Sequence, residues 1–96
     1  MREISVGDVV RSTQGRDKDH WFFVLAADAT TVTLVDGDIR KLASPKRKNR
    51  RHVAPVGVLE HPLREQIERG ATLIDAHLRK ALSALKEEKL SSADTE

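Results

Sequence analysis

The spacing of apolar residues in this 96-residue chain changes at Pro55, and that change constrains the fold more than any other feature. Before Pro55, short apolar runs alternate with turn-forming clusters of Gly, Asp and Ser, which is typical of short β-strands. After it, apolar residues recur every three or four positions, as on one face of an α-helix. We therefore expect a mainly β unit over residues 1–55 and a helical extension over residues 56–96, in a chain with room for one core.

Five short strands are predicted in the first part of the chain. They should lie over residues 6–13, 20–27, 31–35, 39–43 and 51–54. The second is apolar throughout, which suits a central strand that is buried on both faces. Gly15 should occupy a tight turn between the first two strands. Short strands at intervals of about 8 to 12 residues are typical of a small β-barrel.

Two α-helices are predicted in the second part. Pro62, which follows His61, suits the first turn of a helix, and Gly70 is placed to end that helix. A second, amphipathic helix should run from Asp75 to about Glu88 and be followed by a frayed polar tail. We expect its apolar stripe to pack on the β unit, because so small a barrel buries little surface alone.

A stretch of high positive charge lies where the two parts meet. Between Ile39 and Leu59 the chain has seven cations and no acidic residue. Residues 1–55 carry 11 Lys or Arg against seven Asp or Glu, a net charge of +4, whereas residues 56–96 carry six against eight, a net charge of −2. Clustered cations on a small β-scaffold suit a polyanion such as a nucleic acid, whose phosphates repeat along the strand. The alternative is a solvated loop without a partner.

Several kinds of chemistry are excluded. The chain lacks cysteine, so it has neither disulfides nor thiolate metal sites. Asp36 and Asp38 flank Gly37, but two carboxylates fall short of a calcium loop and indicate a turn. The four histidines show no metal-ligand spacing, and neither a nucleophile elbow nor a phosphate-binding glycine loop occurs. We therefore expect no cofactor, no metal site and no catalytic residue.

The distribution of apolar residues along the chain indicates where the protein is located. The first residues lack the long apolar run of a signal peptide, and no stretch approaches the roughly 20 apolar residues that span a bilayer. We therefore expect a cytoplasmic protein without a membrane partner.

The order of four motifs resembles the KOW-type RNA-binding proteins related to large-subunit ribosomal proteins of archaea and eukaryotes. The motifs are GDVV at 7–10, GRDK at 15–18, DGDIRK at 36–41 and PKRKN at 45–49, followed by His52. The resemblance covers about residues 4–54. It implies an SH3-like (KOW) barrel that binds RNA, in particular ribosomal RNA, through basic loops, with ribosomal proteins as further partners. One departure is Lys18-Asp19, where such motifs often continue Lys-Gly.

The charge pattern and the resemblance together nominate two groups of RNA-contact residues. The main phosphate-binding edge is a loop with Lys46, Arg47, Lys48, Arg50 and Arg51 as its cations, Asn49 as a hydrogen-bonding residue, and Arg40 and Lys41 as its extension. A second rim, at the tip of the first hairpin, consists of Arg16, Lys18 and His20. Arg79 and Lys80, on the last helix, are expected to lie outside this surface.

The three aromatic residues Trp21, Phe22 and Phe23 are consecutive, and they admit two interpretations. They could offer a stacking platform for bases, but they are the only aromatic residues of the chain, and a small barrel needs them in its core. We expect Phe22 and Phe23 to be core residues. Alternation places Trp21 on the face opposite Phe22, either packed under the last helix or partly exposed.

We therefore predict a non-enzymatic, ribosome-associated RNA-binding protein. The alternative is a protein-interaction adaptor, in which the barrel or the amphipathic C-terminal helix binds another polypeptide and the basic stretch only aids solubility.

Overall fold

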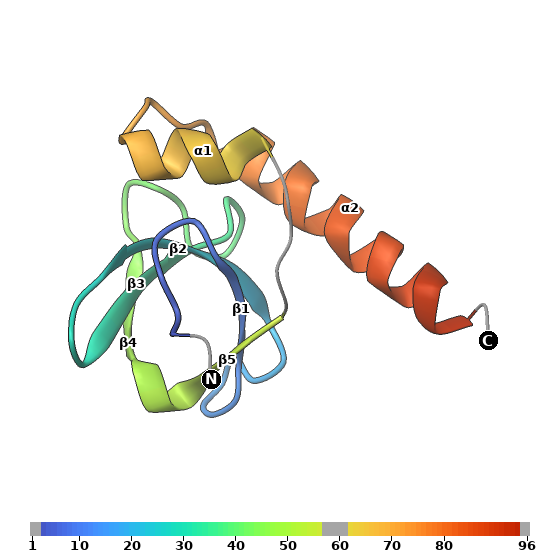
Figure 1. Ribbon diagram of the computed structural model, residues 1–96, viewed down its shortest axis with the longest axis horizontal. Coiled ribbons are helices and arrows are strands. Elements are labelled where there is room, and N and C mark those ends of the chain that lie inside the picture. Colours follow the sequence, from blue (N-terminus) through green and yellow to red (C-terminus); the bar gives the residue numbers. More distant parts are fainter. Residues whose placement is uncertain (1–2, 57–61, 95–96) are drawn as a thin grey trace.

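The computed structural model describes residues 3–56 and 62–94 and has five strands, one 3-10 turn and two α-helices (Figure 1). The elements in chain order are β1 (Val9–Ser12), β2 (Trp21–Ala27), β3 (Thr31–Val35), β4 (Lys46–Asn49), η1 (Arg50–His52), β5 (Val53–Pro55), α1 (Pro62–Arg69) and α2 (Asp75–Asp94). The prediction of a mainly β unit followed by helices is confirmed.

The five strands form one antiparallel sheet in the order β4-β3-β2-β1-β5. The sheet curls around its inner face but is not closed, and β4 and β5 are its two edges (Figure 1). The strand β2 is central, and its residues Phe22 and Phe23 are each only 1% exposed although they point to opposite faces. This confirms the predicted central strand and the predicted core positions.

Each face of the sheet carries its own apolar cluster. On the inner face, residues from β1, β2, β3 and β5 pack together: Val10, Phe22, Val24, Val32, Leu34 and Val53. On the outer face, Val9, Phe23 and Val35 pack against the two helices. The pairing of β2 with β3 shifts register between Val24 and Ala26, which marks a β-bulge and helps the sheet to curl.

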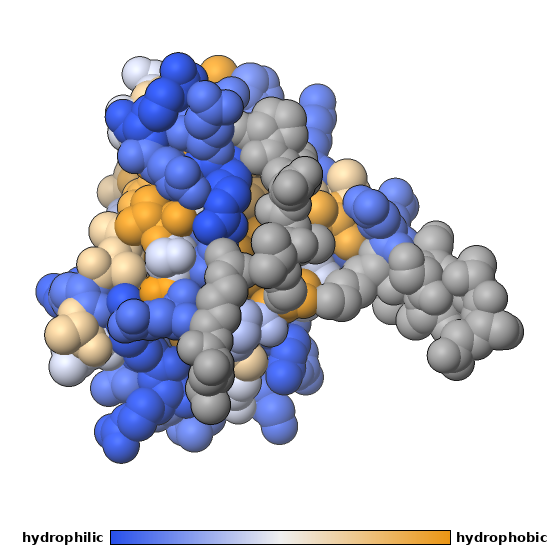
Figure 2. Space-filling model, in the orientation of Figure 1, coloured by the Kyte–Doolittle hydropathy of each residue, from blue (hydrophilic) through white to orange (hydrophobic). Residues whose placement is uncertain are grey.

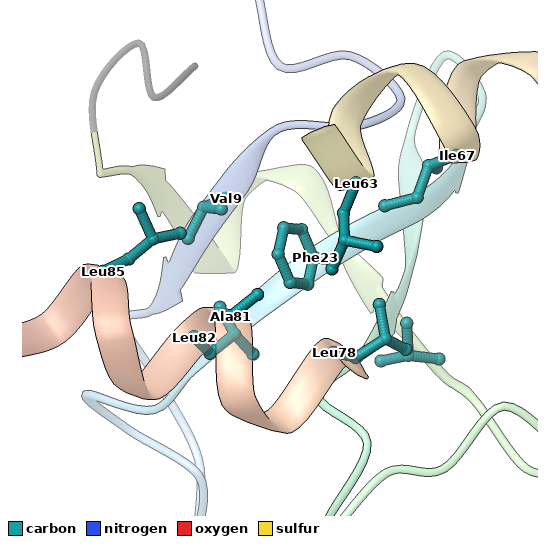
Figure 3. Packing of buried hydrophobic residues seen from close by; sticks show 9 residues of the cluster. Val9, Phe23, Leu63, Ile67, Leu78, Ala81, Leu82 and Leu85 are labelled. Carbon is teal, nitrogen blue, oxygen red and sulfur yellow. The ribbon is translucent and has the colours of Figure 1, made fainter. Parts of the chain in front are cut away.

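Both helices lie over the outer face of the sheet. Figure 3 shows the ring of Phe23 directed from β2 toward Leu63 of α1 and toward the leucines of α2. Leu78 and Leu82 belong to this cluster and are buried. Each fully buried side chain of this size contributes about 1.5–3 kcal/mol by leaving water. The helices therefore complete the second core.

Polar contacts fix the start and the end of α1. Arg64 donates a hydrogen bond to the buried carboxylate of Asp8, with 2.7 Å between Nη1 and Oδ1. Gly70 adopts a φ of +70° and ends the helix. The amides of Gly70 and Ala71 donate to the carbonyls of Ile67 and Gln66, which is the Schellman pattern. The predicted helix start at Pro62 and end at Gly70 are confirmed, whereas His61 lies outside the described residues.

The connection from β3 to β4 is docked on the first turn of α2. Its turn is held by Asp36, whose Oδ1 accepts hydrogen bonds from the amides of Asp38 and Arg40. Gly37 has a φ of +77° and lies directly against the backbone of Asp75. Asp75 in turn accepts a hydrogen bond from the amide of Leu42, at 2.7 Å. The predicted turn at Asp36 and Asp38 is confirmed.

The strand predicted over residues 39–43 is wrong. That segment is a turn, because its amides donate to the carboxylates of Asp36 and Asp75 instead of entering the sheet. The fourth strand is β4, which covers part of the stretch that we expected to be a basic loop.

Three boundaries also differ from the predictions. The first strand starts at Val9 because residues before it form a turn, in which the carboxylate of Asp8 accepts a hydrogen bond from the amide of Ser5. The last strand starts at Val53 because η1 precedes it. The last helix continues to Asp94, beyond the end that was expected near Glu88.

Candidate nucleic-acid interface

The basic strand β4 is an edge of the sheet, and its side chains alternate between the two faces. Lys46 and Lys48 stand opposite Leu34 and Val32 of β3, on the inner face. Arg47 stands opposite Thr33 and points to the outer face. The chain thus divides the predicted phosphate-binding edge between two surfaces with different surroundings.

Both inner lysines converge on one carboxylate. Lys46 Nζ lies 2.7 Å from Asp17 Oδ2, and Lys48 Nζ lies 2.7 Å from Asp17 Oδ1. Lys48 also donates to the carbonyl of Gln14, at 2.6 Å. The side chain of Lys48 is only 8% exposed. These bonds tie the β4 edge to the connection between β1 and β2, residues 13–20, which we call the β1–β2 loop.

The carboxylate of Asp17 is held in its charged form. Partial burial alone raises the pKa of this group, but hydrogen bonds from Lys46, Lys48 and Ser12 outweigh burial and hold the pKa well below its usual range. Ser12 Oγ donates to Asp17 Oδ1 at 2.7 Å. Asp17 therefore offsets part of the positive charge of the two lysines, and both ammonium groups have a partner within the chain.

Arg50 and Asn49 also serve the fold. Arg50 donates to the backbone carbonyls of Asp28 and Ile4, at 2.6 and 2.8 Å. Asn49 caps η1, because its Oδ1 accepts a hydrogen bond from the amide of Arg51 at 2.9 Å. Arg50 thus joins the start of η1 to the N-terminal segment and to the turn between β2 and β3, and Asn49 fixes the turn of η1 itself.

Arg47 is the most exposed cation of β4, with 71% of its side chain accessible. It donates a hydrogen bond to Thr31 at 3.2 Å and lies 3.6 Å from the carboxylate of Asp28. The amides of Thr31 and Thr30 and the hydroxyl of Thr31 donate to Asp28 and lower its pKa to about 2. Arg47 thus faces a charged carboxylate on the outer surface.

The remaining predicted cations have no partner among residues 3–56 and 62–94. Within those ranges, the side chains of the following residues form neither an ion pair nor a hydrogen bond: Arg16, Lys18, Arg40, Lys41 and Arg51. All but Arg40, which is half-buried, are exposed.

Three of these five cations lie at one end of the sheet. Arg16 and Lys18 belong to the β1–β2 loop, and Arg51 belongs to η1. The amide of Thr13 donates to the carbonyl of His52 at 2.8 Å, which joins the loop to η1. This end is mainly hydrophilic in Figure 2, where it lies at the bottom of the view. We call Arg16, Lys18 and Arg51 the basic end.

The other predicted residues lie elsewhere. Arg40 and Lys41 belong to the docked segment between β3 and β4, beside the start of α2. His20 is half-buried, with its ring centroid 6.0 Å from that of Phe22. The structure therefore does not form one continuous edge from all the nominated residues.

Asp17 is the residue whose role the sequence analysis missed. It lies between two cations of the loop, Arg16 and Lys18, and the sequence alone did not indicate a contact with β4. The available signal was the spacing of Lys46 and Lys48, because residues two apart on a strand share a face and can meet one carboxylate.

No protein-family model matches the chain, and no curated protein matches it. Within the described part of the chain, no helix has the length and apolar character needed to cross a membrane. Among those same residues, no group of three or more His, Asp or Glu side chains is placed to hold a metal ion.

Proposed function

We propose that this chain is a non-enzymatic RNA-binding module that contacts phosphates with its basic end. The observation that carries the proposal is that some of the basic side chains bind partners within the chain, whereas others are exposed to solvent. Lys46, Lys48 and Arg50 are committed to internal partners, whereas the basic end is exposed. Cations without internal partners are available to displace condensed counterions from a nucleic acid.

The internal bonds favour binding because they make the basic end rigid. The β1–β2 loop is fixed to β4 through Lys48 and to η1 through Thr13. Cations held on a rigid support lose less conformational entropy on binding than those of a free tail. The structural lysines thus act indirectly, by positioning the cations that contact phosphate.

A finer fold assignment, an SH3-like barrel of the KOW type, is part of the proposal. It is supported by the curled five-stranded sheet, in which β1 pairs with both β2 and β5. The backbone of Asp19 also supports it, because its φ of +74° is one that glycine adopts most easily. Asp19 stands where motifs of that family often have Gly. Association with ribosomes and ribosomal RNA rests on this resemblance.

Salt-dependent RNA binding tests the proposal. The double variant Arg16→Ala/Lys18→Ala is compared with Arg69→Ala/Lys80→Ala, which removes the same charge from exposed helix positions. For single-stranded RNA, losing two phosphate contacts should make the log–log salt slope less negative by about 1.4. The helix variant should keep the wild-type slope. Loss of binding in the helix variant with normal binding in the loop variant would overturn the proposal. Co-sedimentation with ribosomes at low but not high salt tests the cellular partner.

One observation favours the adaptor as a second candidate. Ile39 and Ile74 are 61% and 53% exposed and flank the contact between the docked segment and the start of α2. Exposed apolar residues of this size suit a protein partner. Binding through them would be nearly insensitive to salt, so the same titration separates the two functions.

A further inference from the structure

A groove of about 260 Å³ lies between the start of β2, the turn after β3 and the middle of α2. Its lining residues are His20, Trp21, Asp36, Asp38, Arg79, Leu82, Ser83 and Lys86. Most of them, Arg79 included, are outside the RNA-contact surface that the sequence nominated. His20, which lines the groove, follows Lys18 of the basic end by two positions in the sequence.

The only tryptophan of the chain forms the flat part of this groove. Trp21 packs against the helix-facing core but is partly exposed. The ammonium of Lys86 lies 5.8 Å from the centroid of its ring. Such a contact is weak at a hydrated site, and a long lysine side chain can move aside. Once Lys86 has moved aside, a flat ligand can stack on the indole ring.

Cations of the groove come from α2, and its carboxylates come from the turn after β3. Arg79 and Lys86 extend from α2, whereas Asp38 extends from the turn after β3. The neighbouring Asp36 is buried, and its Oδ1 already accepts two backbone amides. A matching ligand therefore has a flat ring for Trp21, hydrogen-bond donors for Asp38 and a negative charge for the helix.

We propose that this groove binds one guanine nucleotide of an RNA strand whose phosphates contact the basic end. A guanine ring presents two adjacent N–H donors, which suit a carboxylate acceptor, and its phosphate supplies the negative charge. Stacking of a base on an aromatic side chain provides affinity, while the hydrogen bonds to Asp38 provide base preference. This inference rests on the proposed RNA-binding function and assigns to it a base-recognition site.

Trp21 fluorescence of the full chain tests the inference directly, because no other tryptophan contributes. The probes are GMP, IMP, AMP, guanosine and inorganic phosphate, with free N-acetyltryptophanamide as the control for absorption by the nucleotides. GMP should quench saturably. IMP lacks the exocyclic amine and should bind about tenfold more weakly, the loss expected for one hydrogen bond to a charged group. Inorganic phosphate alone should cause no comparable change.

Three variants resolve the contributions. Asp38→Asn should abolish the preference for GMP over IMP. Arg79→Ala should remove the advantage of GMP over guanosine. Lys80→Ala, an exposed change on the same helix that does not line the groove, should bind GMP as the wild type does.

Two outcomes would refute the inference. One is the absence of saturable quenching by any nucleotide; the other is equal quenching by GMP and AMP, or by GMP and phosphate. In either case, RNA binding that still depends on Arg16 and Lys18 would leave the proposed function intact. Conversely, GMP binding without salt-dependent RNA binding would reject the RNA-binding function and keep only a nucleotide site.

Discussion

Replacement of Gly37 by alanine should separate the docked segment from α2. Gly37 adopts a φ of +77°, and a Cβ atom at this position would collide with the carbonyl of Asp75 and crowd the amide of Arg79. Both obstacles are backbone groups of a helix, which cannot turn aside as a flexible side chain can. Either the turn or the helix must therefore move.

The size of the effect follows from a comparison with Gly70. That residue has a similar φ of +70°, but a Cβ there would meet nothing within 4 Å. Gly70→Ala should thus report only the cost of a left-handed backbone, about 1–2 kcal/mol, reduced by the lower entropy of the unfolded chain. Gly37→Ala carries the same cost plus an overpacking penalty of about 1–3 kcal/mol. The Gly37 variant should be the less stable by that difference.

Urea unfolding followed by Trp21 fluorescence measures both variants. With a slope of about 1–3 kcal/mol per molar urea, the expected difference moves the midpoint by roughly 1 M. The folded Gly37→Ala protein should also show altered emission, because Trp21 contacts the same helix through Lys86. If the two variants unfold at the same midpoint, the contact between Gly37 and α2 does not limit stability and the reasoning fails.

The contacts around Asp17 and Asp19 make three further predictions, each measured by urea unfolding. Lys48→Ala should lower the free energy of unfolding by about 1–3 kcal/mol, because it removes a buried partner of Asp17, whereas Lys41→Ala should change it by less than about 0.5 kcal/mol; equal effects would contradict the structural role of Lys48. The pKa of Asp17 is depressed on folding, so its contribution exists above the unfolded pKa of about 3.9 and is lost as pH falls. The gap in stability between wild type and Asp17→Asn should therefore narrow below about pH 4, and a gap independent of pH would refute this. Asp19→Gly should be more stable than Asp19→Ala by about 1 kcal/mol, because glycine accommodates the positive φ; the reverse order would contradict the assigned backbone.

Local signals were sufficient to predict much of the fold. The apolar run of β2 indicates a strand buried on both faces, and it is the centre of the sheet. Pro62 and Gly70 mark the ends of α1 because each acts on its own backbone. Gly15 has the expected positive φ, +91°, and lies between β1 and β2, although the connection is a loop of residues 13–20 and not a tight turn.

The position of the fourth strand could not be predicted in this way. Ile39 and Leu42 resemble strand residues, yet the amide of Leu42 donates to Asp75, which is 33 positions away in the chain. Lys46–Asn49 has little intrinsic preference for a strand and becomes one by pairing with β3. Strand preference depends strongly on such tertiary context.

The residues of the candidate site could also be predicted only in part, because their contacts depend on the tertiary structure. Composition identifies every cation, but it does not tell which of them already has a partner. Lys18 and Lys48 are alike in the sequence, and only the register of β4 and the course of the β1–β2 loop place one in solvent and the other against Asp17.

The placement of α2 on the outer face has a consequence for biosynthesis. Leu85 belongs to the same cluster as Phe23 but is translated roughly sixty residues later, a delay of roughly 3–12 s at ordinary elongation rates. The nascent sheet has no helix over its outer face until α1 emerges, and this face stays only partly covered until α2 follows. A chain that stalls or is truncated before α2 emerges would therefore present Val9, Phe23 and Val35 as a hydrophobic surface to chaperones.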